Sequence, residues 1–461
     1  MADACCSHRF RYLILIIGCL ALTSISSNML AFNIAQVCMA SDSNINETSI
    51  PSPHPTIDYT PKELSLINGA VGVGTALATI PFTEAYSRYG AKYPFLFAGI
   101  LSAISTGLMP SAAQINIYLL LAMRFLQGVS YAADFAAVGM VCSKWASLKQ
   151  NGFFLGVLTS YSPLSTGITN SVSGMICNSS FGWPMIFYGH CFVSLLIFAL
   201  WFLYYSDAPQ MSSRVSGVEL EKIHRNKSAA QINGETNMPY KAILTDLVVW
   251  CVWLNAFTEI FSTNFFAVYA PYYMKNVLHY SVEATGHLSA ISRVTQVPFR
   301  LICGLLSDKI TFMSDTAKLM FFNTITVAGA GIFYIAIGFV PDDTPFLAVL
   351  CIGLLNTVTG AACGGFYKLG VLYTRQYSHF VVANCQFLKC IVLFLGPAMV
   401  AVFVDDETAK EQWRTIFLIV AGLLFFANGA FYKFATAEPA YYTKEGYQSE
   451  SVEKGKKKLE D

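Results

Sequence analysis

Long apolar runs alternate with short polar intervals along almost the whole chain. Each run approaches the roughly 20 residues that an α-helix needs to cross a bilayer. We therefore predict six membrane spans on each side of one long polar interval, from about Asp207 to Lys241. The predicted spans are 12–39, 63–83, 93–110, 117–142, 152–177 and 184–206, then 242–272, 284–306, 319–340, 346–373, 381–403 and 413–435.

This layout predicts an all-α membrane protein built from two pseudo-symmetric six-helix bundles. The expected parts are an N-terminal bundle (1–206), a linker (207–241), a C-terminal bundle (242–435) and a tail (436–461). Composition agrees, because 54% of the 461 residues are hydrophobic and only 12% are charged, unlike a soluble domain. The net charge of +1 gives no reason to expect a nucleic-acid partner, so the expected surroundings are a lipid bilayer.

Basic residues orient the predicted spans. Lys and Arg accumulate on the cytoplasmic side of membrane proteins, and most of the 29 here, Arg300 and Lys368 included, fall on the side that holds both termini and the linker. We therefore expect cytoplasmic termini. The glycosylation sequons at Asn46 and Asn178 then lie on the opposite side, as modification requires. A plasma-membrane and a lysosomal or vesicular location are both compatible with this topology.

Thirteen cysteines are spread through the apolar runs without a repeated spacing. We expect most of them to be small buried residues, with neither a metal site nor a disulfide framework. No phosphate-binding glycine loop and no set of catalytic residues is visible, so we expect neither an enzyme, an ATP-driven pump nor a bound cofactor. A proton or sodium gradient would then supply the energy.

A turn with the same character recurs after spans 2 and 8. The second copy contains Gly304, Asp308 and Lys309, and the first ends in Arg88. Gly allows two helices to approach closely, and an acid followed by a base can form a cytoplasmic charge latch between rocking bundles. Thr83 and Ser87 stand in the first copy where the second has Gly304 and Asp308, which puts the latch in doubt there.

Arg124 lies inside span 4, where a permanent cation is costly and indicates a water-filled cavity. A structural alternative is an Arg that extends to the nearby surface or pairs with an acid. Asp134 in the same span, Arg293 in span 8 and Lys389 in span 11 are further pathway candidates. Tyr367 and Lys368 are expected towards the cytoplasmic end of span 10, facing solvent or lipid.

Longer motifs resemble a known family. The two recurring turns are similar to the signature of the major facilitator superfamily. Further motifs resemble its anion:cation symporter branch, which contains vesicular glutamate transporters, sialin and sodium-phosphate cotransporters. They are Arg124 with Gln127-Gly128, Ser143-Lys144-Trp145-Ala146, Gly182-Trp183-Pro184, Pro271-Tyr272-Tyr273-Met274 and Trp413-Arg414. The resemblance implies the fold of that superfamily, a monomer, and transport of a small solute.

The chain departs from that family at four intramembrane positions. Asn68 stands where a His is common, Tyr131 where a Glu is common, and Glu259 where an Arg is common. Ser26 appears in place of a frequent Arg, and Arg124 alone is retained. These changes favour a less highly charged solute, and they allow two hypotheses for Glu259: a salt bridge to Arg124, or a binding site for a coupling proton.

The resulting prediction is a secondary transporter of a small organic solute, expected to be an organic anion, that works by alternating access. Two alternatives stay open at this point. A transporter-like receptor would bind the solute without moving it, and an uncoupled anion conductor would pass a current without fixed stoichiometry.

Overall fold

The computed structural model describes residues 9–39, 57–177, 179–225, 227, 238–280, 288, 291–406 and 408–444. Within these ranges every regular element is helical. Where the structure describes them, the predicted spans correspond to one helix or to a run of consecutive helices, so the predicted all-α membrane fold is confirmed. Part of the predicted span 284–306 lies outside the described residues. By length and composition, seven helical stretches in this part of the chain can cross a membrane, or eight if a pair bent by 45° counts as one span.

The chain divides into two compact units. One comprises Tyr12–Ala137 and Leu158–Tyr205, and we call it the N unit; the other comprises Met1–Arg11, Val138–Val157 and Ser206–Asp461, and we call it the C unit. By its contacts, the segment Val138–Val157 therefore belongs with the second half of the sequence. The predicted bundle boundaries at 206 and 242 stay a prediction.

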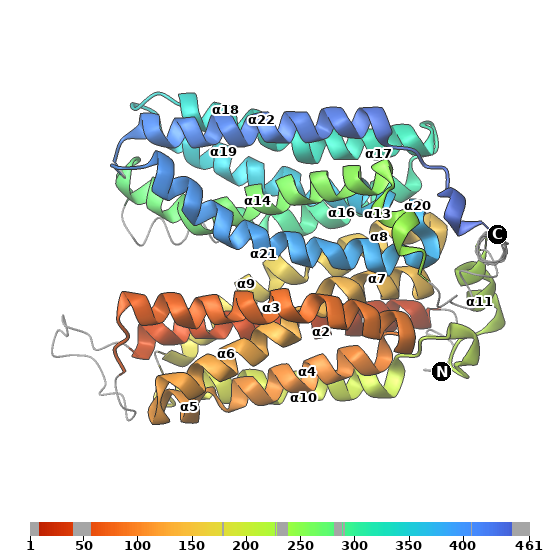
Figure 1. The fold of residues 1–461 in the computed structure, drawn as a ribbon, viewed down its shortest axis with the longest axis horizontal. Coiled ribbons are helices and arrows are strands. Elements are labelled where there is room, and N and C mark those ends of the chain that lie inside the picture. Colours follow the sequence, from red (N-terminus) through yellow and green to blue (C-terminus); the bar gives the residue numbers. More distant parts are fainter. Residues whose placement is uncertain are drawn as a thin grey trace, which may run out of the picture. The chain divides into compact units, whose positions relative to one another are not determined.

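The helices of the N unit run through the warm-coloured half of Figure 1. They are α2 (Phe10–Met39), α3 (Pro61–Tyr89), α4 (Lys92–Gly107), α5 (Met109–Ile115), α6 (Ile117–Tyr131), α9 (Tyr161–Cys177) and α10 (Pro184–Tyr204). Helix α7 (Asp134–Trp145) begins in this unit and ends in the C unit. Helix α8 (Asn151–Thr159) begins in the C unit and ends in this one. Within this unit the most extensive helix contacts are those of α3 with α6 and of α4 with α10.

Local signals set the ends of α3 beyond the predicted span 63–83. Thr60 and Glu63 form a reciprocal capping box at its start, which satisfies backbone donors that would otherwise lack partners. Gly90 ends the helix at φ 74°, a left-handed conformation that Gly adopts without steric cost.

The C unit contains the helices of the second half of the chain. They are α11 (Gly217–His224), α13 (Tyr240–Leu244), α14 (Leu247–Asn276), α16 (Gln296–Lys309), α17 (Asp315–Asn323), α18 (Gly329–Phe339), α19 (Pro345–Val358), α20 (Phe366–Thr374), α21 (Ser378–Phe403) and α22 (Lys410–Phe434). A π-helical turn joins α17 to α18, and a 3-10 turn joins α19 to α20. Helix α14 packs against α21 and α22.

The linker helix α11 is tied to the start of α2. The buried carboxylate of Glu219 accepts hydrogen bonds from the backbone N–H groups of Phe10 at 3.1 Å and Arg11 at 2.9 Å. These are first-turn donors of α2, which have no partner within the helix itself. An acid at a helix N-terminus also interacts favourably with the helix dipole. Glu219 thereby makes part of the polar linker a structural element.

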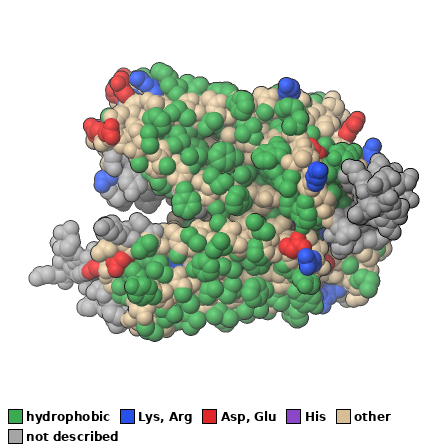
Figure 2. Space-filling model, in the orientation of Figure 1, with side chains coloured by type: hydrophobic (Ala, Val, Ile, Leu, Met, Phe, Trp, Pro, Cys, Tyr) green, Lys and Arg blue, Asp and Glu red, His purple; other side chains and the backbone are tan. Residues whose placement is uncertain are grey.

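Hydrophobic side chains cover much of the face shown in Figure 2. Large exposed apolar residues occur along α4 and α10, for example Phe97 and Leu203, and along α18, for example Ile332. An apolar hollow of about 570 Å³ between α3, α4 and α6 is lined by residues such as Leu77 and Phe97. These surfaces suit contact with acyl chains, and the hollow lacks the polar groups that a charged solute would need.

Candidate functional site

Arg124 lies in α6, roughly 12 Å along the helix from Asn116, which caps its start. The side chain is only 3% exposed. Its Nη1 atom donates to the backbone oxygen of Met29 at 2.8 Å and to Oε1 of Gln127 at 2.9 Å. Its Nε atom lies 3.4 Å from the backbone oxygen of Ile67. Every one of these acceptors is uncharged, so the hydrogen bonds leave the positive charge uncompensated.

The Nη2 atom of Arg124 is the end of the guanidinium that contacts an exposed residue. It donates to Oδ1 of Asn68 at 3.2 Å, and Asn68 itself is exposed. A guanidinium carries five N–H donors, and this arrangement leaves one Nη2 donor without an acceptor among the described residues. The ring of Phe32 lies 4.9 Å from the guanidinium carbon. Asn68 and Arg124, predicted separately as site residues, are thus in direct contact.

Gln127 connects Arg124 to the supporting helices. Its Nε2 atom donates to the backbone oxygen of Asn28 at 3.1 Å and to Oγ1 of Thr106 at 2.8 Å. The Asn28 side chain in turn donates to Ser102 and Ser194, both at 2.9 Å, on α4 and α10. Buried networks of this kind fix side-chain geometry because each broken bond leaves a buried polar group unsatisfied. Sequence reasoning missed Gln127 as a residue that positions Arg124, although its spacing of three along a helix was a usable signal.

The other predicted residues of the N unit lie around this network. Ser26 of α2 is buried and hydrogen-bonds to Ser165 of α9 at 2.8 Å. Tyr131 is buried at the last turn of α6. Asp134 is fully buried in the first turn of α7, where the helix dipole favours a carboxylate.

Glu259 is placed roughly 18 Å along α14 and is 6% exposed. Its carboxylate interacts electrostatically with Arg300 of α16 and Lys389 of α21. Arg300 lies within α16 and is only 7% exposed, and its predicted place on the cytoplasmic side stays a prediction. A charged side chain is buried at lower cost when an opposite charge lies near it. Glu259 interacts with Arg300 in this way, but no local sequence pattern pairs the two residues.

Arg293 contacts the same part of α14. Its Nη2 atom donates to the backbone oxygen of Thr263 at 3.3 Å, and Oγ1 of Thr263 lies 3.1 Å from Oε1 of Glu259. The described electrostatic partners of Glu259 belong to its own unit. The hypothetical bridge from Glu259 to Arg124 would join the two units and stays a prediction.

Asp308 contacts both a helix N-terminus and a buried lysine. Its Oδ1 and Oδ2 atoms accept hydrogen bonds from the backbone N–H groups of Gly152 at 3.0 Å and Phe153 at 2.7 Å, in the first turn of α8. Lys368 of α20 donates to Asp308 at 2.6 Å and to the backbone and hydroxyl oxygens of Ser307. Three acceptors match the three protons of an ammonium group.

This contact corrects two expectations. Lys309, the predicted basic partner, is exposed, and the ion pair of Asp308 is formed by Lys368 instead. Lys368 and its neighbour Tyr367 are buried, although solvent or lipid was expected around them. The reason is that the 3-10 turn at Thr359–Gly364 packs against α16 and brings the following helix beside Ser307.

Gly304 makes the close approach that its motif predicted. A Cβ atom at this position would lie 2.6 Å from the backbone oxygen of Gly152, which only a Gly avoids. The first copy of the motif is different, because exposed Arg88 pairs with Glu84 one turn earlier on the same helix. Such a surface pair contributes little stability.

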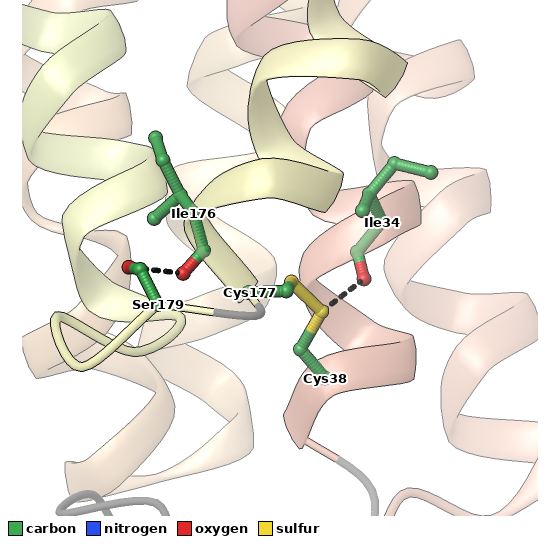
Figure 3. The surroundings of a disulfide bond; sticks show 5 residues. All are labelled: Ile34, Cys38, Ile176, Cys177 and Ser179. Atoms are coloured by element: carbon green, nitrogen blue, oxygen red, sulfur yellow. Dashed lines mark hydrogen bonds between the residues drawn. A yellow bond between two sulfur atoms is a disulfide. The ribbon is translucent and has the colours of Figure 1, made fainter.

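A disulfide joins Cys38 at the end of α2 to Cys177 at the end of α9, as Figure 3 shows. The sequence showed no disulfide framework, so this single bond was not predicted. The two residues are 139 positions apart, and only the folded N unit brings them together. Among the other described cysteines, eight are buried, as expected. Asn46 and Asn178, the predicted glycosylation sites, lie outside the described residues.

Metal binding has no visible basis in the part of the chain that the structure describes, because no three His, Cys, Asp or Glu side chains gather there. The N unit presents an arginine with neutral partners, and the C unit presents one carboxylate among cations.

Comparison with protein families matches residues 16–397 to the Major Facilitator Superfamily. Human sialin is 26% identical, with 81% of this chain and 75% of sialin covered. Mouse sodium-dependent phosphate transport protein 1 is 25% identical over 95% of this chain and 96% of that protein. A probable small intestine urate exporter of the mouse is 24% identical over 83% of this chain and 78% of that protein.

The fold is also similar to solved structures. The proton:xylose symporter XylE, bound to 6-bromo-6-deoxy-D-glucose, superposes with a TM-score of 0.72 at 14% identity. The match covers 93% of this chain and 96% of XylE. At this identity the likeness concerns the fold alone.

Proposed function

Because this chain belongs to the major facilitator superfamily, as a divergent relative of sialin and the phosphate transporters, we propose that it is a secondary active transporter of a small organic anion. Alternating access between two halves moves the solute in such carriers. We propose that the protein acts as a monomer and is not an enzyme.

The observation that carries the proposal is the buried guanidinium of Arg124 with uncharged partners. A buried charge without a counterion is costly, which favours binding of an anion to Arg124. Asn68 is the exchangeable partner, since it is exposed and neutral, whereas Gln127 is buried and Met29 contributes the backbone oxygen of a half-buried helix position. The anion would take the free Nη2 donor and displace Asn68, forming a charge-assisted pair.

We also propose an orientation of the chain in the membrane. Both termini are proposed to be cytoplasmic, which puts the ends of α2 and α9 on the opposite side. The disulfide between Cys38 and Cys177 supports this, because disulfides persist on the oxidising side of membranes. The contact of Asp308 with the start of α8 then lies on the cytoplasmic side. There it would act as the gate that opens when the helices separate.

Binding and uptake together test the proposal. The purified full-length protein is first assayed for thermal stabilisation by urate, benzoate and phosphate, and then reconstituted for uptake of the same probes. Saturating ligand should stabilise the wild type by about 2.7 kcal/mol at a hundredfold excess over Kd. Arg124→Ala should abolish both signals, while Arg225→Ala, at an exposed arginine of the linker, should keep both.

Two outcomes would contradict the transporter, and a third would contradict the site at Arg124. Stabilisation without uptake identifies a receptor, and current without coupled uptake identifies a conductor. An Arg124→Ala protein that still folds and binds the anion as well as the wild type would exclude Arg124 from the site.

A further inference from the structure

The apolar hollow of the N unit is a shaped surface that the proposed transport does not use. Six lining residues come from α3, from Leu77 to Tyr89, three from α4, from Tyr93 to Phe97, and one from α6. Its volume of about 570 Å³ lies within the range of small-molecule sites, roughly 300–1,000 Å³. Apart from the two tyrosine hydroxyls, every lining side chain is apolar. Such a surface favours a hydrocarbon over a polar solute.

The length of the hollow matches one leaflet of a bilayer. Leu77 and Tyr89 lie at its two ends on α3, and the helix rises roughly 18 Å between them. Half of the hydrocarbon core of a bilayer is about 15 Å thick. A hollow that starts at the membrane surface beside Tyr89 therefore reaches about the middle of the bilayer, as one acyl chain does.

Two tyrosines place one end of the hollow at the membrane surface. Tyr89 ends α3 and Tyr93 lies in the first turn of α4, and they are 68% and 62% exposed. Tyrosine is enriched where hydrocarbon meets water, because its ring is apolar and its hydroxyl is polar. Only Gly90 and Ala91 separate the two helices. The turn therefore lies at the level of the lipid headgroups.

Basic residues from both helices flank this turn. Arg88 is in the last turn of α3, is 67% exposed, and its Nε atom lies 2.6 Å from Oε1 of Glu84 on the same helix. Lys92 begins α4, and its Nζ atom lies 5.1 Å from the ring centre of Phe202 on α10. A guanidinium has five N–H donors in a planar fork, a geometry that suits carboxylate and phosphate alike. A phosphate at the turn would meet a cation on either helix.

We propose that the apolar hollow binds one acyl chain of an anionic phospholipid whose phosphate contacts Arg88 and Lys92. The chain lies along α3, and the hydroxyls of Tyr89 and Tyr93 donate to the headgroup. A phospholipid fits both parts of this surface, since it joins hydrocarbon to a phosphate. An apolar helix of a second copy would fill the hollow but leave the two bases without a complementary charge.

The proposed orientation agrees with this ligand. Cytoplasmic termini put the turn between α3 and α4 on the cytoplasmic side, where the leaflet carries anionic lipids. Each Lys or Arg near such a surface strengthens binding by roughly fivefold. The lipid site depends on the membrane fold and this orientation, and it does not depend on the identity of the transported solute.

Native mass spectrometry of the purified full-length protein in detergent tests the charge. The protein is titrated with phosphatidylglycerol and with phosphatidylcholine of the same acyl chains. The wild type should prefer phosphatidylglycerol by roughly fivefold for each of the two bases. Arg88→Gln combined with Lys92→Gln should bind both lipids equally. Lys433→Gln, at an exposed lysine in the last turn of α22, should keep the preference.

A second pair of variants tests the hollow itself. Ala85 belongs to the lining, so Ala85→Phe should narrow the hollow and weaken phosphatidylglycerol binding. Ile104→Phe also enlarges a side chain, on the same unit but outside the lining, where Ile104 is 50% exposed. This control should bind like the wild type. Glycerol phosphate, which carries the phosphate without acyl chains, should not displace the lipid at equal concentration.

Three results would overturn the lipid site. They are equal affinity of the wild type for both lipids, unchanged phosphatidylglycerol binding by Ala85→Phe, and displacement of the lipid by glycerol phosphate. A dimer that disappears in Ala85→Phe would instead identify a second copy as the occupant. None of these measurements uses transport, so the lipid site and the proposed transporter stand or fall independently.

Discussion

Lys368 and Asp308 form a buried ion pair between α20 and α16, with 2.6 Å between Nζ and Oδ1. The two side chains are 9% and 6% exposed. Asp308 also accepts two backbone hydrogen bonds from the first turn of α8. One carboxylate therefore joins three helical segments that are far apart in the sequence.

Removal of this carboxylate should destabilise the C unit. Asp308→Asn leaves the Lys368 ammonium buried beside a neutral group, which costs about 3–5 kcal/mol when a buried pair is broken. Thermal unfolding of the purified protein should therefore begin at a lower temperature. Asp308→Asn combined with Lys368→Met should recover part of the loss, because no unpaired charge remains.

The matched control is Asp315→Asn. Asp315 pairs with Lys318 but is 72% exposed, so its loss should change stability by at most about 1 kcal/mol. Equal effects of Asp308→Asn and Asp315→Asn would contradict the structural importance of the buried pair.

Two glycines permit the close crossing of α3 and α6. A Cβ atom on Gly74 would lie 2.3 Å from the backbone oxygen of Phe125, and one on Gly128 would lie 2.1 Å from that of Val71. Gly74→Ala should therefore force the helices apart and lower Tm. Gly69→Ala on the same helix meets nothing within 4 Å. Since Ala is favoured over Gly in a helix by about 0.5–1 kcal/mol, this control should keep or raise Tm.

The disulfide gives a test of orientation. Cys38 and Cys177 should resist a membrane-impermeant maleimide until they are reduced, and should then react from the non-cytoplasmic side. In sealed microsomes, labelling should require both reduction and permeabilisation. Single Cys38→Ser and Cys177→Ser variants identify the reacting thiols. Labelling of either from the cytoplasmic side would reverse the proposed topology.

Lys227 should produce a stability change with pH. Its Nζ atom donates to the backbone oxygens of Ser143 at 2.8 Å and Lys144 at 3.4 Å, near the end of α7. Burial, and then the charge of Lys144, lowers the pKa of Lys227 to about 7. Between about pH 7 and the unfolded value near 10.4, the unfolded chain binds more protons, so this group adds stability as pH rises.

The control for the wild type is the variant Lys227→Met, whose side chain at position 227 cannot titrate. The difference in Tm between wild type and variant should grow in favour of the wild type from about pH 7 to about pH 10. A difference that is constant over this range would show that the pKa of Lys227 is not lowered.

Local pattern was sufficient for the layout of the helices. The length and polarity of each run predicted where helices lie, and motif spacing pointed to Arg124, Gly304 and Asp308. These features depend on neighbours within a few turns of one helix, which a single sequence displays directly. The internal breaks of spans 3, 4, 5 and 10 were not predicted, because their apolar pattern continues across them.

The sequence pattern did not show which charged side chains and which thiols pair with one another. Lys309 was the nearest base to Asp308 along the chain, yet Lys368, 60 residues away, forms the pair. Cys38 meets Cys177 over 139 residues, and Arg300 lies near Glu259 only because α14 and α16 share one unit. Hydropathy along the chain thus determined which segments are helices in a membrane. Tertiary packing decided which charges and thiols meet, because those contacts join helices distant in sequence.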